Sequence, residues 1–321
     1  MQNNAKQVGK IRDRWSWVEP DVWTDRMLTA LEKGVKGDVW FSLIDKVYSM
    51  KNLRKAFEKV KKKKGGPGID NQTIGRFEAR LEENLKWIQD NLKKGTYTPQ
   101  SIKRVWIPKP GSREKRPLGI PTVRDRVVQT ALRNVLEPIF EHGFAENSYG
   151  FRPTRGAKDA LRQVKRLIKD GFTHVVDIDL KSYFDSIPHQ ELLVMIKEKV
   201  ADSRVLKLIE AYLKQKVMDT SREWDPISGT PQGAVISPLL SNIYLNPLDH
   251  LMEKEGFNMI RYADDFIIHC KSNEDAQQAL RLVEDWTVQM GLTLHPVKTR
   301  ITNIAEGGRF DFLGYEFYKH Y

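Results

Sequence analysis

Apolar residues recur at helical spacing along much of the chain. The clearest stripe runs from Val127 to Phe140, where apolar positions return every three or four residues. Gly95, Gly171 and Gly291 follow other such stripes, at positions where glycine commonly ends a helix. The remaining helical predictions fall within residues 1–50 and in 51–64, 73–95, 160–171, 189–218 and 274–290, and residues 228–246 predict a turn running into a helix.

Strand patterns interrupt these helices. Residues 174–184 (HVVDIDLKSYF) alternate and predict a strand, and residues 258–270 (NMIRYADDFIIHC) predict two strands joined by a tight turn. Residues 101–121 predict a basic hairpin with a glycine turn. Residues 292–304 and 310–317 predict further short strands. This mixed order favours an α+β fold over a parallel, doubly wound sheet.

Composition and charge narrow the class of protein. The 321 residues are 40% hydrophobic, and 53 basic residues against 42 acidic ones give a net charge of +11. Such an excess indicates a polyanionic partner, most simply nucleic acid. The single cysteine, Cys270, excludes an internal disulfide framework and fits a reducing cytosol. No apolar run is long enough to span a bilayer, so we expect no membrane partner.

The basic residues are concentrated near a lysine run. Between Lys51 and Asp70 there are eight basic and two acidic residues. The run itself consists of Lys61, Lys62, Lys63 and Lys64. It predicts either a solvated helix end or a surface that binds RNA phosphates.

Two adjacent carboxylates lie in the predicted turn of residues 258–270. Asp264 and Asp265 stand between apolar strands, where a pair of buried negative charges is costly. Asp179 ends the predicted strand upstream, and neighbouring strands would bring it to the same point. A surface turn is the simpler interpretation of the pair alone. Together, the three carboxylates suit two Mg²⁺ ions about 3.5–4 Å apart that catalyse phosphoryl transfer.

Several motifs in order resemble those of bacterial group II intron reverse transcriptases, between about Asn52 and Tyr315. YADD (262–265) resembles the signature turn of these enzymes, and DIDLKSYF (177–184) resembles their first catalytic motif. The other similar segments are IPKPGSREKRPLGIPTVRDRVVQTAL, SYGFRP, GTPQGAVISPLLSNIYL, GLTLHPVKT and FLGYEF.

The resemblance implies a role for each matching residue. Asp179, Asp264 and Asp265 would be catalytic and would bind two Mg²⁺ ions, or Mn²⁺ as a substitute, with the Leu180 carbonyl as a further ligand. The residues implied for dNTP binding are Lys109, Arg116, Phe184 and Gln232, with Phe184 excluding a 2′-hydroxyl. Lys298 is a candidate proton donor to pyrophosphate. Leu313 and Gly314 would form the primer grip.

The resemblance also implies an architecture and partners. It implies a right-hand polymerase fold, with fingers and a palm whose central antiparallel sheet packs on helices. We expect an N-terminal helical extension (1–50), mainly fingers (51–172) and mainly palm (173–321), without the thumb that normally follows. The implied partners are intron RNA or another RNA template, a DNA or RNA primer and dNTPs, in the bacterial cytoplasm. A homodimer is left open.

Two other roles stay open at this point. One is a related bacterial reverse transcriptase linked to CRISPR loci or to diversity generation. The other is an RNA-binding splicing cofactor with an idle polymerase site. An RNA-dependent RNA polymerase is less consistent with Phe184, because such enzymes usually need a smaller residue there.

Overall fold

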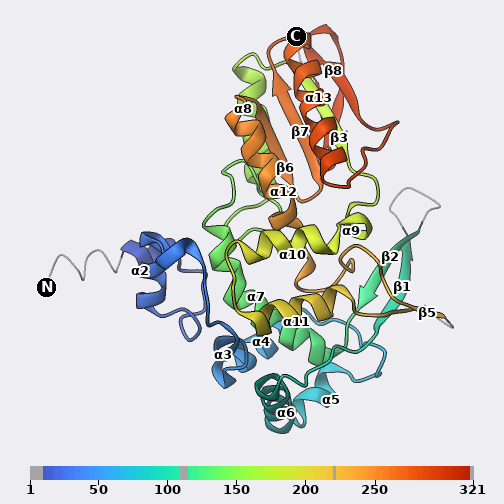
Figure 1. The fold of residues 1–321 in the computed structure, drawn as a ribbon. Coiled ribbons are helices and arrows are strands. Elements are labelled where there is room, and N and C mark those ends of the chain that lie inside the picture. The colour runs from blue at the N-terminus through green and yellow to red at the C-terminus, as the bar shows by residue number, and fades with distance from the viewer. Residues whose placement is uncertain (1–9, 109–114, 220–221, 319–321) are drawn as a thin grey trace, which may run out of the picture. The chain divides into compact units, whose positions relative to one another are not determined.

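The computed structural model describes residues 10–108, 115–219 and 222–318 (Figure 1). The chain divides into two compact units that interleave along the sequence. Unit 1 contains the residues up to Gly143 together with His189–Leu239, and unit 2 contains Phe144–Pro188 together with the residues from Leu240 onward. The assignment of 51–172 to fingers and 173–321 to palm stays a prediction, and each unit is described below by itself.

Unit 1 is mainly helical and packs around one central helix. Helix α7 (Val123–Glu141) is buried on almost every side, which is why its sequence is apolar around most of its circumference. Asn52 of the neighbouring helix α4 (Met50–Lys62) donates to the Ala131 carbonyl at 3.0 Å and accepts from Asn134 at 2.9 Å. The other helices of this unit are α2 (Asp25–Lys33), η1 (Lys36–Asp38), α3 (Ile44–Val47), α4 (Met50–Lys62), α5 (Ile74–Glu78), α6 (Leu81–Lys94), α10 (His189–Lys197) and α11 (Ser203–Leu213).

The single helix predicted over 73–95 is wrong in one respect, because the chain breaks between α5 and α6. Arg80 has φ −127° and ψ 41°, which is outside the helical region. The Phe77 carbonyl, which a continuous helix would bond to residue 81, instead accepts a hydrogen bond from the Asn84 side chain at 2.9 Å. The predicted stop at Gly95 is confirmed, since this residue caps α6 with φ 71°.

The sheet of unit 1 has the strand order β2-β1-β4-β5. β1 (Ile102–Pro108) and β2 (Lys115–Ile120) form the predicted antiparallel hairpin, and the residues of its turn lie outside the described part of the chain. β4 (Val217–Asp219) and β5 (Arg222–Trp224) complete the sheet. The sequence pattern did not predict these two strands, because three residues are too few for an alternation to be recognised.

Unit 2 is built on a four-stranded antiparallel sheet with the order β6-β7-β3-β8. Its strands are β3 (His174–Asp179), β6 (Asn258–Tyr262), β7 (Asp265–Cys270) and β8 (Arg300–Asn303), and a separate hairpin consists of β9 (Phe310–Phe312) and β10 (Tyr315–Phe317). The accompanying helices are α8 (Ala157–Lys169), α9 (Tyr183–Ser186), α13 (Asn273–Gln289), η2 (Ile304–Glu306) and, from Leu240, α12 (Ser237–Lys254). The strand predicted over 174–184 therefore ends at Asp179, and the following residues turn into α9.

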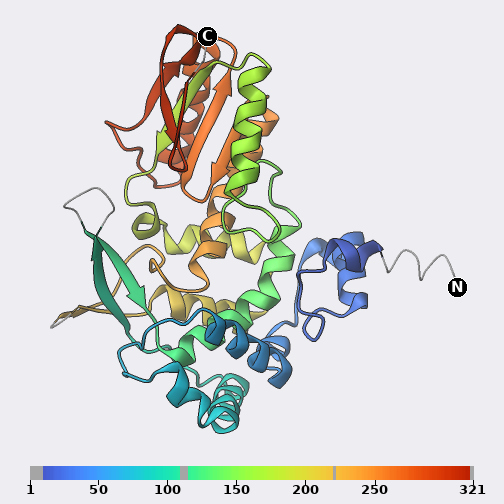
Figure 2. The ribbon, with the colours of Figure 1, turned by 180° about the vertical axis from the view of Figure 1, so that it is seen from behind.

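The two faces of this sheet are covered differently. Helix α8 and the β9–β10 hairpin share a core with one face, in which Val164, Val175, Ile267 and Phe310 are buried together. Helix α13 contacts β3, β7 and β8, and Figures 1 and 2 show it on the face opposite α8. Because side chains alternate along a strand, Asp179 lies on the same face of β3 as Val175, the face that α8 and the hairpin cover.

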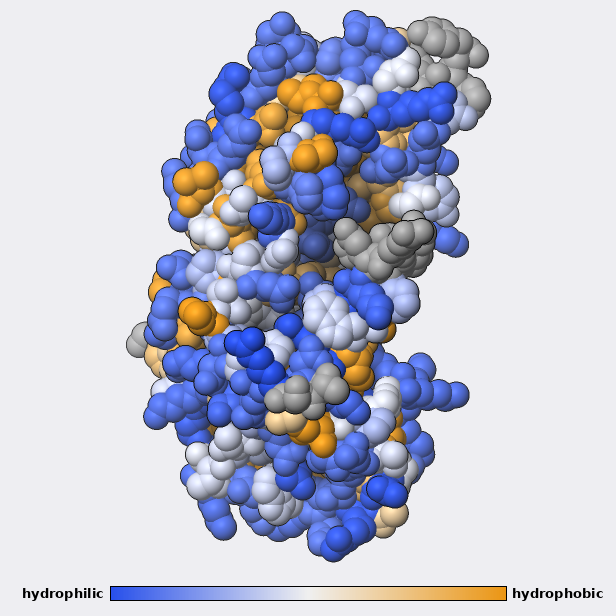
Figure 3. Space-filling view, turned by 90° about the vertical axis from the view of Figure 1, so that its right-hand side faces the viewer, coloured by the Kyte–Doolittle hydropathy of each residue, from blue (hydrophilic) through white to orange (hydrophobic). Residues whose placement is uncertain are grey.

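Hydrophilic residues dominate the face seen in Figure 3, and apolar residues form only scattered patches on it. Within the described ranges, no helix is both long enough and apolar enough to cross a membrane.

Candidate active site

The three predicted carboxylates meet at one end of the β3–β7 pair. Asp179 is the last residue of β3 and Asp265 is the first residue of β7, and the antiparallel register pairs these two residues directly. Asp264 precedes Asp265 in the turn between β6 and β7. The sequence-based expectation that neighbouring strands bring Asp179 to the Asp264–Asp265 turn therefore agrees with the geometry.

The turn that carries Asp264 is held by the segment SYGFRP. Ala263 has φ 63°, a left-handed conformation that an alanine adopts at some cost. The Tyr149 N–H donates to the Arg261 carbonyl at 2.8 Å, which places the 148–150 backbone along the start of the turn. A Cβ atom on Gly150 would lie 2.2 Å from the Ala263 nitrogen, so only glycine permits this approach.

A buried arginine fixes the same turn from the other side. The Arg261 guanidinium donates to both carboxylate oxygens of Asp249, at 2.7 and 2.5 Å. Its Nη1 donates to the Asn242 side chain at 2.8 Å and to the Ala263 carbonyl at 2.9 Å. The Arg261 side chain is fully buried, so this bidentate pair lies in a medium where hydrogen bonds are strong and unpaired charges are costly. The network therefore determines the path of the backbone immediately before Asp264.

The environment of Asp264 and Asp265 disfavours the ionised forms of these two carboxyls. Burial, together with the nearby carboxylates of Asp177, Asp264 and Asp179, raises the pKa of Asp265 to about 7. Burial also raises the pKa of Asp264, with a smaller contribution from Asp179, while Arg261 opposes the rise. Such a cluster of costly negative charges is stabilised by added positive charge.

Two basic side chains of the chain itself supply part of that charge. Lys298 Nζ lies 3.0 Å from Asp179 Oδ2, and Arg300 Nε lies 3.6 Å from Asp177 Oδ2. Lys298 is thus the counter-ion of a predicted catalytic carboxylate, and its role as a proton donor stays a prediction. In the part of the chain that the structure describes, no three His, Cys, Asp or Glu side chains are already arranged as a metal-binding group.

The residues after Asp179 form a short, anchored helix. Ser182 has φ 49° and begins the turn into α9. Tyr183 is buried and its hydroxyl donates to the Ser241 carbonyl at 2.8 Å, whereas Phe184 is only half-buried. Tyr183 therefore fills the core position at this point, which leaves the Phe184 ring partly accessible. Leu180 is buried and bridges to Leu294, and its proposed carbonyl contact with a metal stays a prediction.

The predicted primer-grip residues lie next to the carboxylates. Leu313 and Gly314 join β9 to β10 with φ values of 52° and 79°, as in the type I′ turns that connect short hairpins. A backbone hydrogen bond from Leu313 to Asp265 opposes the rise in the pKa of that carboxyl. The turn of this hairpin is thus fastened to the end of β7.

Arg116 and Gln232, two of the residues predicted to bind the incoming nucleotide, belong to unit 1, whereas Phe184 belongs to unit 2. Arg116 is exposed on β2, and the Gln232 carbonyl accepts a hydrogen bond from Gly119 of the same strand at 2.6 Å. A Cβ atom on Gly233 would lie 2.5 Å from the Gly119 carbonyl oxygen, so this glycine allows the Gln232 turn to pack on β2. Lys109 lies outside the described residues.

The predicted RNA-binding lysines lie at the end of α4. Lys61, Lys62, Lys63 and Lys64 are all exposed. Lys61 forms an ion pair with Glu78, which draws one of the four charges into an intramolecular contact. RNA binding by this run stays a prediction.

Comparison with known proteins decides the family. The sequence profile described as reverse transcriptase (RNA-dependent DNA polymerase) matches residues 107–317, which is more than half of the chain. The chain belongs to the reverse transcriptase family. The match includes the carboxylate cluster and the Leu313–Gly314 turn.

The curated relatives of this reverse transcriptase domain include an intron-encoded protein. It is 34% identical to protein YkfC of Escherichia coli over 288 residues, covering 78% of this chain and 75% of that protein. It is 41% identical to the group II intron-encoded protein LtrA of Lactococcus lactis over 196 residues, covering 60% of this chain but 32% of LtrA. The chain thus spans about three quarters of one relative and a third of the other.

A solved structure supports the fold. A telomerase from Candida albicans, in complex with a fragment of telomeric RNA, superimposes with a TM-score of 0.51 at 13% identity. The match covers 73% of this chain and 49% of the telomerase chain. At this identity the likeness concerns the fold alone, and it agrees with the predicted α+β polymerase architecture.

Sequence reasoning missed the side chains that position the reverse transcriptase site. Arg261 stands in an apolar strand, and a charged residue there was the available signal for a buried partner. Gln129 is buried in α7, where its side-chain carbonyl accepts from the Val235 N–H at 2.7 Å and holds the chain that follows Gln232. No local pattern could have named these partners, which lie 12 and 106 residues away from Arg261 and Gln129.

Proposed function

We propose that this domain is the RNA-directed DNA polymerase of a group II intron-encoded protein. It would extend a primer with dNTPs on an RNA template. The direct pairing of Asp179 with Asp265, beside Asp264, is the observation that carries the proposal, because it assembles the carboxylates that nucleotidyl transfer requires.

The oxygen atoms of these carboxylates are suitable ligands for divalent metal ions. The oxygens of Asp179, Asp264 and Asp265 are hard ligands, and the raised pKa values of Asp264 and Asp265 indicate a site that lacks positive charge. These three side chains, with the Leu180 carbonyl, would hold two Mg²⁺ ions, or Mn²⁺ in their place. Bound there, the ions would activate the primer hydroxyl and stabilise the leaving pyrophosphate oxygen.

The other residues would bind and orient the substrates. Lys109 and Arg116 would neutralise the triphosphate, where positive charge offsets the charge that develops in phosphoryl transfer. Gln232 would position the nucleotide, and the partly accessible Phe184 ring would exclude a ribose 2′-hydroxyl. Lys298 would move away from Asp179 and would then protonate the departing pyrophosphate.

Two surfaces would contact the nucleic acids. The Leu313–Gly314 turn would position the primer, since its hydrogen bond to Asp265 fixes it beside the carboxylates. The run Lys61–Lys64 would bind intron RNA and so assist splicing and mobility. We place this activity in the bacterial cytoplasm and leave a homodimer as a question for sedimentation.

Primer extension tests the proposal. With an oligo(dT) primer on poly(rA), the wild-type chain is expected to incorporate dTTP in Mg²⁺. Asp179→Asn and Asp264→Asn should each abolish incorporation while RNA affinity stays within a few-fold. Asp285→Asn, which removes an exposed carboxylate on α13, is the matched control and should extend normally.

The outcomes separate the alternatives. Near-wild-type extension by Asp179→Asn or Asp264→Asn would contradict the carboxylate assignment. A wild-type chain that binds RNA tightly but incorporates no dTTP would instead favour the RNA-binding splicing cofactor with an idle polymerase site.

A further inference from the structure

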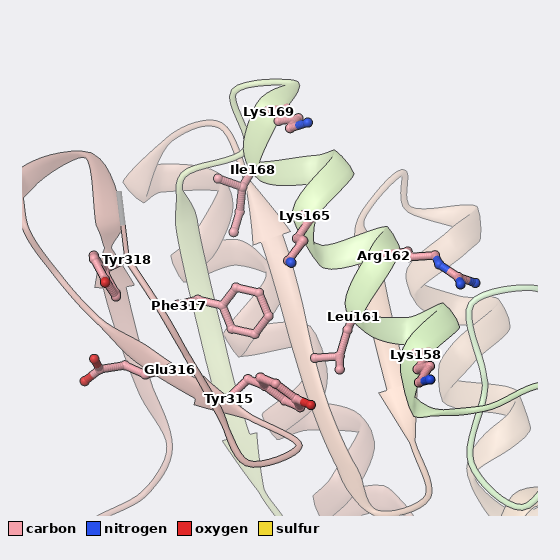
Figure 4. Close-up of a pocket in the computed structure, with 10 residues that line it drawn as sticks. All are labelled: Lys158, Leu161, Arg162, Lys165, Ile168, Lys169, Tyr315, Glu316, Phe317 and Tyr318. Carbon is pink, nitrogen blue, oxygen red and sulfur yellow. The ribbon is translucent and has the colours of Figure 1, made fainter. Parts of the chain in front are cut away.

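A groove of about 570 Å³ runs between α8 and β10 in unit 2 (Figure 4). Its floor is apolar and consists of Leu161, Ile168 and Phe317, which pack on the core under the sheet face. None of these residues belongs to the carboxylate cluster. The groove is therefore a separate feature from the candidate active site.

One wall of the groove is a row of cations. Lys158, Arg162, Lys165 and Lys169 recur at intervals of four, three and four residues, so they lie on one face of α8. Lys158, Lys165 and Lys169 are exposed, and none forms a hydrogen bond or ion pair with another described residue. Arg162 donates to Asp159 at 2.8 Å, at the protein surface. Three unpaired ammonium groups beside an apolar floor favour a ligand with several negative charges.

The opposite wall offers an aromatic surface. Tyr315 is 61% exposed, and Figure 4 shows its side chain beside Leu161 and Phe317 at the groove. Glu316 is the one acidic residue among those lining the groove, and Arg309 lies 3.2 Å from its carboxylate. An exposed aromatic ring next to a row of cations is the combination that binds single-stranded nucleic acid, because bases stack on the ring while phosphates contact the cations.

The position of the groove fits such a strand. Tyr315 directly follows the Leu313–Gly314 turn, and that turn is hydrogen-bonded to Asp265. The groove therefore starts near the carboxylate end of the sheet and continues along α8. A duplex has no free base faces to stack, whereas a single strand has.

We propose that this groove binds a segment of single-stranded RNA. Lys158, Lys165 and Lys169 contact its phosphates, and one base stacks on Tyr315. RNA is named rather than DNA because the chain belongs to a family of RNA-dependent polymerases. The inference goes beyond the proposed polymerase function, since it concerns binding by residues outside the carboxylate cluster.

Anisotropy of a fluorescein-labelled 12-nucleotide oligo(U), titrated with the full chain in EDTA at several salt concentrations, tests the cations. EDTA keeps the measurement independent of polymerase activity. Each phosphate contact on a single strand contributes a slope of about −0.7 in log affinity against log salt, so Lys165→Ala/Lys169→Ala should flatten the slope by about 1.4. Lys254→Ala/Arg281→Ala removes the same charge from exposed sites outside the groove and should leave the slope close to that of the wild type.

The tyrosine provides a second, charge-neutral test. Tyr315→Ala should weaken oligo(U) binding about tenfold, within the range measured for base–aromatic stacking, and Tyr315→Phe should restore it. With 4-thiouridine in the RNA, cross-links to the peptides that contain Lys165 or Tyr315 are expected, and they should persist in the Asp264→Asn variant.

Several results would overturn the proposal. An equal change of slope in the two double variants, or unchanged affinity in Tyr315→Ala, would mean that the groove does not bind RNA. Groove-dependent binding that is tighter for oligo(dT) would exclude RNA as its ligand. If sedimentation shows a dimer that Tyr315→Ala dissociates, while oligo(U) binding is unaffected, a second copy of the chain fills the groove instead.

Discussion

The Asp265 carboxyl accepts a hydrogen bond from the backbone of Leu313, which ties the end of strand β7 to the turn of a hairpin 48 residues downstream. The same carboxyl faces Asp179 across the β3–β7 pair. One residue thus links the candidate metal ligands to the candidate primer grip. A displacement of the hairpin would therefore change the surroundings of the carboxylates.

The partly accessible ring of Phe184 gives a prediction about sugar selection. Phe184→Val should raise the incorporation of rNTPs relative to dNTPs, because the smaller side chain removes the clash with the 2′-hydroxyl. Single-nucleotide kinetics with matched dNTP and rNTP pairs would measure the ratio. An unchanged ratio would mean that Phe184, like Tyr183, only packs in the protein.

The buried pair of Arg261 and Asp249 gives a prediction about stability. Arg261→Met leaves the Asp249 carboxylate buried without its partner, which should lower the free energy of unfolding by about 3–5 kcal/mol. Arg261→Met/Asp249→Leu removes both charges and should recover much of that loss. Urea denaturation would measure both variants. A double variant no more stable than the single one would show that the hydrogen bonds to Asn242 and Ala263 matter more than the charge pair.

Asp202 gives a prediction about pH. Burial alone would raise the pKa of this carboxyl, but hydrogen bonds from the backbone N–H groups of Leu43, Ile44, Val205 and Arg204 lower it below its usual value. A carboxyl with a lowered folded-state pKa stabilises the protein above its unfolded pKa of about 3.9, and this stabilisation is lost as the pH falls through the folded value.

Asp202→Asn should therefore be less stable than the wild type at pH 7, by about 1.5–3 kcal/mol. The difference should begin to narrow below about pH 4, where the carboxyl becomes protonated in the unfolded chain, and should be smallest below its lowered folded-state pKa. Urea denaturation midpoints of both proteins at pH 7, 5, 4 and 3 would measure this difference in stability. A difference independent of pH would mean that the loss arises from hydrogen-bond geometry and not from charge.

The lysine run at the end of α4 gives a prediction about salt. If two or three of Lys61–Lys64 contact RNA, replacing all four with Ala should flatten the slope of log affinity against log salt by roughly 2. Filter binding of a structured RNA at several salt concentrations would measure it. A variant with Ala at Lys33, Lys94, Lys197 and Lys254, which are exposed elsewhere, controls for net charge. Equal slopes in the two variants would mean that the run is only a solvated helix end.

The local sequence pattern predicted a helix or strand correctly where apolar residues recur regularly along the whole element. The apolar stripe located α7, alternation located β3, and apolar runs on either side of a tight turn located the two strands around Asp264. It failed where a side chain a few residues away replaces a backbone bond, as Asn84 does at the α5–α6 break. It also failed for β4 and β5, which are too short for any period to appear.

The chemistry of the candidate site could be predicted from the sequence, but the residues that hold its carboxylates in position could not. Adjacent carboxylates between apolar strands marked Asp264 and Asp265, and the family motif selected Asp179. The partners that position them, such as Arg261, Gly150 and the Leu313 backbone, act across long sequence separations. Their contacts depend on which strands pair, and a single sequence does not encode that pairing locally.

The strand order β6-β7-β3-β8 also has a consequence for synthesis on the ribosome. Among the described strands, β3 pairs only with β7 and β8, and both are encoded after the whole stretch His189–Leu239 of the other unit. While the nascent chain grows from Asp179 to Asp265, for on the order of ten seconds, strand β3 has neither neighbour. During that interval both of its edges are open to pairing with another chain. A ribosome stalled before β7 would therefore carry an aggregation-prone intermediate that a chaperone must shield.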